Sequence, residues 1–128
     1  MNMIVVAPHP DDEVLGCGGT ISRFANLDYN VYVVYITQML EEYGYTKQDI
    51  DVRADRMVKV ADLLELRDTI SLQYEPAGIQ GQHLGKMIKE LHGIFDNLSP
   101  EIIFIPYEGD VHSDHYYTHK ACLAACKH

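Results

Sequence analysis

Basic residues are scarce in this chain of 128 residues, which has ten lysines and arginines against 19 aspartates and glutamates. The formal net charge is −9 at pH 7, and the few cations are scattered singly along the chain. Such a charge repels phosphate backbones and anionic lipid headgroups unless a basic patch interrupts it. We therefore expect no nucleic acid and no membrane as partners, and a substrate that is neutral or only locally anionic.

Long apolar runs and paired cysteines are also lacking. No stretch approaches the ~20 apolar residues that span a bilayer, and Met1–Val6 has no basic segment typical of a leader. Three cysteines (Cys17, Cys122 and Cys126) are an odd number without framework spacing, which argues against a disulfide scaffold. These absences favour a reducing compartment, and we expect a cytoplasmic protein.

The composition is that of a folded protein. Apolar residues make up 47% and charged residues 23% of the chain, close to globular averages, so a disordered or fibrous chain is excluded. This length suits one apolar core, and we expect a single domain over residues 1–128.

Alternating sequence patterns predict four strands and four helices. Runs rich in β-branched and aromatic residues predict strands at 3–7, 31–37, 69–72 and 101–105. Helical spacing of apolar residues predicts helices at 12–26, 47–66, 82–98 and 115–126. Strands that alternate with helices imply βαβ units with right-handed crossovers. The sequence predicts an α/β, Rossmann-like three-layer αβα fold with a mostly parallel sheet of strand order 3-2-1-4.

Two clusters of polar residues follow the first and the fourth predicted strands. Residues 9–13 read His-Pro-Asp-Asp-Glu, and residues 110–115 read Asp-Val-His-Ser-Asp-His. Acidic residues at a helix start also stabilise its positive end, so the first cluster alone does not indicate a site. In the order 3-2-1-4, however, the first and fourth strands are neighbours, and the loops after them meet in one crevice where such sheets bind ligands.

The spacing within each cluster agrees with convergence in that crevice. His9 with Asp12, and His112 with His115, are each three residues apart and share one side of a helical turn. Because Asp11 and Asp12 are adjacent, they point in different directions. One of them can bind a metal ion while the other stays free to handle protons.

These residues resemble the motifs of the PIG-L/LmbE-like family of N-acetylglucosaminyl deacetylases. The segment 9–13 matches the N-terminal motif of the family, and Asp110-x-His112-x-Asp114-His115 is similar to its later motif. The stretch 18–20 (Gly-Gly-Thr) and Pro106 also resemble family positions. The resemblance implies a zinc-dependent hydrolase that removes the N-acetyl group from an N-acetylglucosamine-type or related N-acylated amino sugar.

Carried over to this sequence, the resemblance implies a role for each residue of the two motifs. The implied metal ligands are His9, Asp12 and His115. Asp11 would be the general base, His112 would polarise the scissile carbonyl or stabilise the oxyanion, and Asp114 would orient a histidine. Two imidazoles and one carboxylate leave a position for water, whose pKa zinc lowers to about 7. The implied partner is a small amino-sugar conjugate, with a homo-oligomer as a further expectation.

The chain departs from the family pattern at several places. The loop 37–41 lacks an expected glycine, Arg56 stands where an acidic residue is usual, and Glu65 replaces a helix-ending glycine. The family normally continues well past its second motif, which leaves open a truncation at the carboxyl end. Two alternatives follow, namely a non-catalytic metal- or sugar-binding module of the same fold, and iron(II) or another divalent ion in place of zinc.

Three glycines interrupt the first predicted helix. Gly16, Gly18 and Gly19 do not form the Gly-x-Gly-x-x-Gly pattern of a dinucleotide site, and they follow the turn rather than form it. We expect instead that they allow this helix to pack closely on the sheet.

Overall fold

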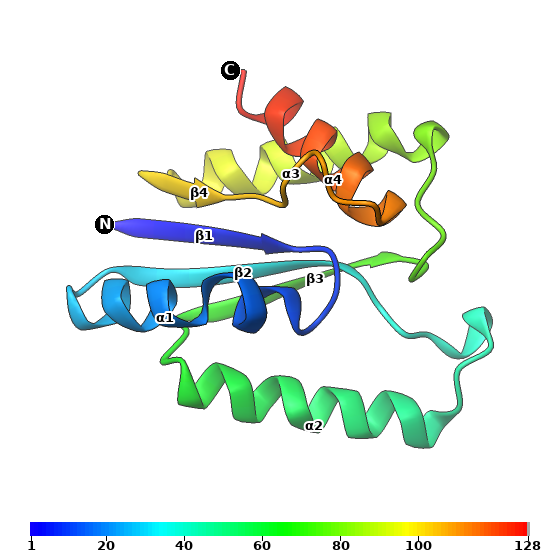
Figure 1. Ribbon diagram of the computed structural model, residues 1–128, viewed down its shortest axis with the longest axis horizontal. Coiled ribbons are helices and arrows are strands. Elements are labelled where there is room, and N and C mark those ends of the chain that lie inside the picture. Colours follow the sequence, from blue (N-terminus) through cyan, green and yellow to red (C-terminus); the bar gives the residue numbers. More distant parts are fainter. Residues whose placement is uncertain (128) are drawn as a thin grey trace.

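A parallel sheet of four strands forms the middle layer of the molecule (Figure 1), as seen in a computed structural model that describes residues 1–127. The strands are β1 (Asn2–Ala7), β2 (Asn30–Thr37), β3 (Asp68–Tyr74) and β4 (Ile102–Phe104). They are ordered β3-β2-β1-β4, and each neighbouring pair is parallel. The predicted strand order is therefore confirmed.

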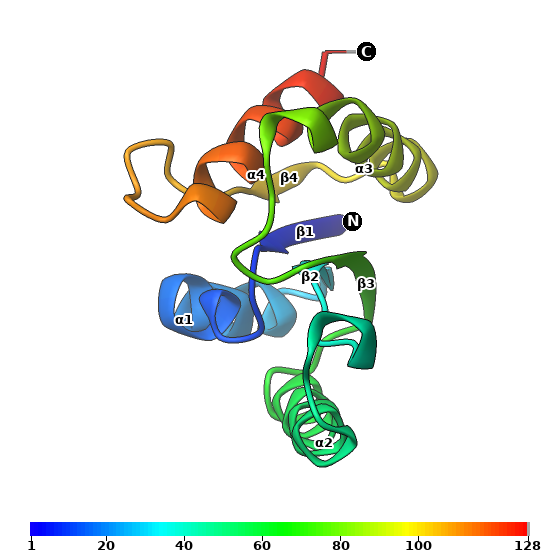
Figure 2. The same ribbon diagram turned by 90° about the vertical axis from the view of Figure 1, so that its right-hand side faces the viewer.

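Helices cover both faces of this sheet (Figure 2). One face carries α1 (Asp12–Asn26) and α2 (Lys47–Leu63), and the other carries α3 (Leu84–Leu98) and α4 (Ser113–Ala125). Two short 3-10 turns, η1 (Glu41–Tyr43) and η2 (Gly81–His83), precede α2 and α3. The predicted three-layer α/β fold is confirmed. Over residues 1–127, no helix is both long and apolar enough to cross a membrane.

The two central strands are buried on both faces because helices cover the sheet from either side. Side chains along β1 alternate between the two layers, since successive residues of a strand point to opposite faces. Ile4 and Val6 pack against α3 and α4, whereas Met3 and Val5 pack toward α1 and α2. Each fully buried apolar side chain of this size contributes about 1.5–3 kcal/mol to stability. This core fixes the carboxyl ends of β1 and β4 side by side.

The end of α2 differs from the prediction, which placed it at Leu66. The helix ends at Leu63, and Glu65 adopts a left-handed conformation with φ 55°. The amide of Leu66 donates to the carbonyl of Ala61 and the amide of Glu65 to that of Asp62, which is the Schellman arrangement of a helix end. In the family pattern that the sequence resembles, a helix-ending glycine stands at the position of Glu65. The backbone of Glu65 has the left-handed conformation that glycine favours.

The predicted boundaries of several other elements were also wrong by one or two residues. The third strand is longer than 69–72 because it pairs with β2 from Asp68 onward, and the fourth is shorter than 101–105. The third helix starts at Leu84 rather than at residue 82, since η2 takes up the preceding residues. The last helix starts at Ser113 instead of His115, because His112 caps it.

The expected close packing of the three glycines was also wrong. A Cβ atom built on Gly16 or Gly19 meets no atom within 4 Å, and one on Gly18 meets only Val14 Cγ1 of its own helix, at 3.9 Å. Gly16 and Gly19 are exposed. Close approach to the sheet therefore does not explain these glycines, and the packing of α1 gives no other physical reason for them.

We predict that Glu65→Gly raises the free energy of unfolding by about 1 kcal/mol, because glycine removes the steric cost of the left-handed backbone. The matched control is Ala54→Gly, on the exposed side of α2, which should lower that free energy by up to about 1 kcal/mol. Urea denaturation of the three proteins measures both changes. A loss of stability in Glu65→Gly would contradict the backbone assignment.

Candidate functional site

The turn after β1 is held in place by the end of β2. The amide and the hydroxyl of Thr37 both donate to the carbonyl oxygen of Pro8, at 3.0 and 2.7 Å. One residue later, the amide of His9 donates to Asp12 Oδ2 at 2.8 Å, and the amide of Asp12 returns a bond to the carbonyl of His9 at 3.1 Å. These reciprocal bonds set His9 and Asp12 side by side at the start of α1.

Glu13 anchors this turn to the sheet. It is not one of the side chains that converge at the site. Its side chain is buried, and its carboxylate accepts hydrogen bonds from Tyr35 Oη at 3.1 Å and from the amide of Asp11 at 3.2 Å. Burial raises the pKa of Glu13, although its hydrogen bonds oppose the rise. The third carboxylate of the first motif is therefore structural.

The turn after β4 brings the second cluster to the same edge of the sheet. His112 caps α4, with its Nδ1 accepting a hydrogen bond from the amide of Asp114 at 3.1 Å. A neutral imidazole that accepts at Nδ1 carries its proton on Nε2, so His112 presents a donor there. The ring centroids of His9 and His112 are 4.7 Å apart, and those of His9 and His115 are 5.5 Å apart.

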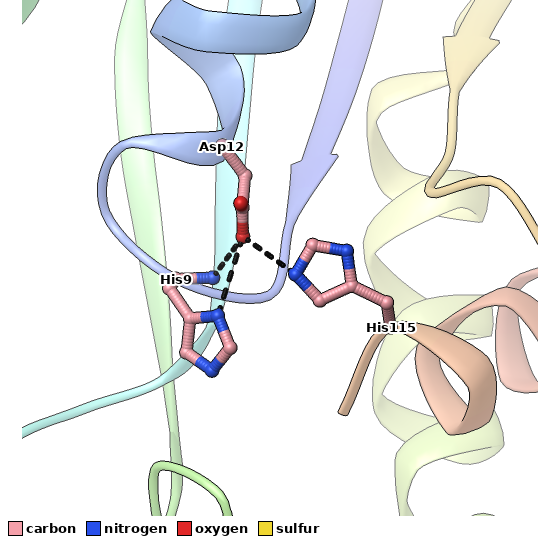
Figure 3. Close-up of side chains that lie close together, drawn as sticks. All are labelled: His9, Asp12 and His115. Atoms are coloured by element: carbon pink, nitrogen blue, oxygen red, sulfur yellow. Dashed lines mark hydrogen bonds and ion pairs between the residues drawn. The ribbon is translucent and has the colours of Figure 1, made fainter. Parts of the chain in front are cut away.

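Three side chains from the two turns converge on one point (Figure 3). Asp12 Oδ2 lies 3.4 Å from His9 Nδ1 and 3.2 Å from His115 Nε2, and the three groups meet the distances expected of a metal-ion site. Ligand atoms about 2.0–2.1 Å from a tetrahedral zinc ion are themselves about 3.3 Å apart. Both contacts made by Asp12 match that separation, so this donor set fits a divalent cation.

Two further carboxylates orient the two histidine rings from behind. His9 Nε2 lies 2.8 Å from Asp114 Oδ2, and His115 Nδ1 lies 3.0 Å from Asp110 Oδ2. In each ring the other nitrogen faces Asp12. Such outer carboxylates fix the tautomer and the direction of metal-binding histidines. His9, His112 and Asp114 also form a second group with metal-site spacing, but its Asp114 oxygens already accept other hydrogen bonds.

The carboxylate of Asp114 is fully buried and ties three segments together. Besides the contact with His9, it accepts hydrogen bonds from the amides of Ala77 at 2.7 Å and Ile79 at 3.2 Å. Ala77 has a left-handed backbone with φ 60°, which turns these amides of the β3–α3 loop toward α4. Position 114 therefore joins the two site loops to a third loop that no motif in the sequence had singled out.

The charges of the site support one another. Hydrogen bonds with Asp114 and Asp12 raise the pKa of His9 to about 9, against the opposing effect of burial. Burial acts to raise the pKa of Asp12 and of Asp114, but the hydrogen bonds and charge interactions that each carboxylate receives, those from His9 among them, together outweigh it. The pKa of both carboxyls therefore stays below its ordinary value. In the protein without metal, the proton on His9 holds two carboxylates close together, as a cation would.

A cavity of about 390 Å³ opens beside the three converging side chains. Asp12 and His115 reach its wall, and Leu15 and Tyr107, both largely exposed, lie at its margin. The cavity gives a small molecule access to the point between Asp12 and His115. Its remaining lining is mostly apolar, from the ends of β1 and β4.

The structure separates the predicted residues into two groups. The rings and carboxylates of His9, Asp12, His112, Asp114 and His115 lie together at the carboxyl edge of the sheet. The side chain of Asp11 is exposed and makes no hydrogen bond with residues 1–127. It lines a different cavity, between α1 and α2. Its assignment as general base stays a prediction.

Sequence reasoning missed three contributors to the site, each for a different reason. Asp110 lay within the second motif but had received no role, although its position five residues before His115 was visible. Tyr35 was hidden in a strand that reads as core. Ala77 contributes only a backbone amide, so its residue type gave no signal at all.

A family model described as PIG-L, GlcNAc-PI de-N-acetylase, matches residues 4–126, nearly the whole chain. This chain belongs to the PIG-L family. The family prediction made from the two motifs is thereby confirmed, and the motif residues carrying it lie on the turns after β1 and β4.

Two relatives match almost the full length of this PIG-L chain. It is 28% identical to the uncharacterized deacetylase YaiS of Escherichia coli K12, over 98% of this chain and 68% of that protein. It is 25% identical to a Bacillus anthracis protein named "Probable N-acetyl-alpha-D-glucosaminyl L-malate deacetylase 2", over 97% of this chain and 58% of that protein.

A solved structure shares the fold. The N,N'-diacetylchitobiose deacetylase of Pyrococcus horikoshii, in complex with its inhibitor MPG, superposes with a TM-score of 0.83 at 24% identity. The match covers 97% of this chain and 48% of that one. The chain thus spans about half to two thirds of the length of these three proteins.

We predict that Asp114→Asn and Asp110→Asn both weaken zinc binding by about 10- to 100-fold, because each removes the carboxylate behind a histidine ring. Only Asp114→Asn should also cost about 2–3 kcal/mol of stability, since its carboxylate is fully buried whereas that of Asp110 is 37% exposed. Zinc competition titrations and urea denaturation measure the two effects.

The matched control is Asp55→Asn, which removes an exposed ion pair with Lys59 on α2. It should change stability by less than about 0.5 kcal/mol and leave zinc affinity unchanged. Equal losses of stability in Asp110→Asn and Asp114→Asn would contradict the distinction drawn between the two carboxylates.

Proposed function

We propose that this protein is a metal-dependent hydrolase that removes the N-acetyl group from an N-acetylglucosamine-type or related N-acylated amino sugar. The convergence of His9 Nδ1, Asp12 Oδ2 and His115 Nε2 carries the proposal. Membership of the PIG-L family supports the choice of reaction. The names of the two relatives, both deacetylases and one of them acting on an N-acetylglucosaminyl conjugate, support the choice of substrate.

His9, Asp12 and His115 are the residues that would hold the metal ion, and we propose zinc. When bound, a divalent ion at this position supplies Lewis acidity, which polarises an amide carbonyl and makes a water molecule easier to deprotonate. Imidazole and carboxylate donors suit zinc and equally suit iron(II). Reconstitution with each ion under anaerobic conditions, followed by activity measurement, identifies the ion that supports turnover.

Asp11 is proposed to take up the proton that the attacking water loses. Asp11 directly precedes the ligand Asp12, and its carboxylate makes no hydrogen bond with the described residues, so it is free to accept a proton. Because its side chain lines the cavity between α1 and α2, the proposal requires it to turn toward the metal ligands when substrate binds. In the balanced reaction, the water oxygen forms a bond to the amide carbon and the carbon–nitrogen bond breaks. Asp11 then returns the proton to the departing amine nitrogen, and acetate and a free amino sugar result.

His112 is proposed to stabilise the negative charge that develops on the carbonyl oxygen. Its Nδ1 is occupied by the amide of Asp114, which leaves an N–H donor on Nε2, beside the His9 ring. A fixed donor aimed at a developing oxyanion costs no reorganisation during the reaction. His112 therefore combines two tasks, since the same ring caps α4 and presents the donor.

We predict opposite consequences for the two adjacent aspartates. Asp12→Asn should abolish both zinc binding and acetate release from an N-acetylglucosaminyl conjugate. Asp11→Asn should retain zinc but lower kcat by about 10²- to 10⁴-fold, because only proton transfer is lost. Metal analysis and acetate assays measure both, with Asp55→Asn as the surface control. Loss of zinc in Asp11→Asn would contradict this assignment and would indicate that Asp11 is the metal ligand and Asp12 the proton acceptor.

Turnover tests the alternative of a non-catalytic module directly. If the protein binds zinc and an N-acetylated sugar stoichiometrically but releases no acetate with either zinc or iron(II), it is a binding module and the proposed function is wrong.

We predict that His112→Asn lowers kcat by about 10²- to 10³-fold while the helix remains capped, because asparagine keeps an acceptor for the amide of Asp114 but not the imidazole donor. His112→Ala should show the same kinetic loss and, in addition, lose about 1 kcal/mol of stability. Comparing the two variants separates the cap from the donor. Full activity in His112→Asn would rule out the proposed oxyanion contact.

A further inference from the structure

A buried pair of polar side chains, Tyr35 and Glu13, lies beneath the turn that carries the proposed metal ligands. Tyr35 is near the carboxyl end of β2, and its hydroxyl donates to Glu13 Oε1 at 3.1 Å. The other carboxylate oxygen of Glu13 accepts the amide of Asp11 at 3.2 Å. Two consecutive hydrogen bonds therefore lead from the core of the sheet to the backbone of the proposed proton acceptor.

Packing alone does not explain this pair. Glu13 is 2% exposed, and Tyr35 belongs to an apolar cluster that also contains Ile21 and Val33. Taking a carboxylate out of water is costly, and well-packed apolar side chains of similar size would fill the same space without that cost. The hydrogen bonds of the pair, rather than its volume, therefore distinguish it from the rest of the cluster.

The hydrogen bonds of Glu13 also change how α1 begins. Asp11 occupies the capping position of this helix, where an aspartate side chain ordinarily accepts a hydrogen bond from an amide of the first turn. Its carboxylate makes no such bond. Glu13 instead accepts the amide of Asp11, as the acidic residue of a capping box accepts the amide of the capping residue. The backbone of Asp11 is thus held while its carboxylate stays available for a proton.

The turn has two anchor points on β2. Thr37 holds it at the carbonyl of Pro8, and Glu13, itself bonded to β2, holds it at the amide of Asp11. That amide also donates to the carbonyl of His9 at 2.9 Å, but this carbonyl belongs to the turn itself. A bond within the turn does not set its position relative to the sheet, whereas the bond to Glu13 does.

We propose that Tyr35 and Glu13 are positioning residues for Asp11, because they fix its backbone so that rotation of its side chain alone can bring the carboxylate to the metal ligands. The catalytic part of this role rests on the proposed function, in which Asp11 takes up a proton. Both residues act through the backbone of Asp11, since the carboxylate of Glu13 bonds to Tyr35 and to that amide rather than to the converging side chains. We therefore expect an effect on kcat and none on zinc affinity.

A second buried tyrosine provides a matched control. The hydroxyl of Tyr74, at the end of β3, donates to Glu90 Oε1 of α3 at 3.0 Å. Tyr74 is buried like Tyr35, but its glutamate also lies 3.7 Å from Lys86 of the same helix, away from the two motifs. Tyr35→Phe and Tyr74→Phe therefore each remove one hydroxyl that donates to a glutamate, and they differ in what that glutamate holds.

Acetate release from methyl N-acetylglucosaminide tests the positioning. Tyr35→Phe should lower kcat by about 10- to 10²-fold without changing KM or zinc affinity, because a reacting group displaced by about 1 Å loses that much rate. Tyr74→Phe should keep kcat. In an Asp11→Asn background, Tyr35→Phe should cause no further loss, since the tyrosine acts through the carboxylate of Asp11. Equal losses of kcat in the two tyrosine variants, or a further loss in the Asp11→Asn background, overturn the proposal.

Two substitutions of Glu13 separate position from charge. Glu13→Gln keeps an acceptor for the amide of Asp11 and a polar group for Tyr35, so it should retain most of kcat. Glu13→Met is similar in size but has no comparable acceptor, and its kcat should fall as in Tyr35→Phe. Full kcat in Glu13→Met, or equal losses in Glu13→Met and Glu13→Gln, overturn the positioning role.

Hydrogen exchange of the Asp11 amide, measured by NMR, separates this proposal from the proposed function. The amide should exchange about tenfold or more faster in Glu13→Met and in Tyr35→Phe than in the unsubstituted protein, and at an unchanged rate in Tyr74→Phe. If no acetate is released while exchange changes in this way, the positioning of Asp11 stands and the deacetylase function fails. If acetate is released but exchange at Asp11 is unchanged in Glu13→Met, the function stands and the positioning fails.

Discussion

The geometry of the site depends on the buried carboxylate of Asp114. Removing a charge from water costs several kcal/mol unless hydrogen bonds replace the lost hydration, and here three donors do so, namely His9 Nε2 and the amides of Ala77 and Ile79. These donors come from the turns after β1 and β3, while Asp114 itself belongs to α4. One carboxylate thus holds three segments that are far apart in the sequence. It also turns the other nitrogen of His9 toward Asp12.

The need of each carboxylate for a nearby donor or positive charge also explains how the site can be strongly acidic. Asp12, Asp110 and Asp114 surround two imidazoles, and in the protein without metal a proton on His9 partly balances them. Neutral imidazoles with a divalent cation would bring the group close to charge balance without that proton. Acidic groups that would repel one another in an empty cleft are therefore consistent with a cation-binding function, and each has a separate task. Asp12 faces the cation position, whereas Asp110 and Asp114 hold the rings.

Much of this arrangement could be predicted from the sequence because it follows from strand order. The β-branched runs of β1 and β2 indicated buried strands, and the order 3-2-1-4 placed the turns after β1 and β4 together, which is where His9, Asp12 and His115 meet. The contacts that depend on backbone conformation were not predictable. The amide of Ala77 has no residue-type signal, and the glycines of α1 proved not to pack closely on the sheet.

The first turn of α1 separates two environments. Asp12 faces His115 and one cavity, Asp11 lines the other cavity, and the exposed Leu15 borders both. A substrate bound across this turn would place its amide near the metal ligands and a neighbouring substituent near α2. Asp11 and Asp12 thus face different cavities although they are adjacent in the sequence, and only Asp12 lies against the two histidines.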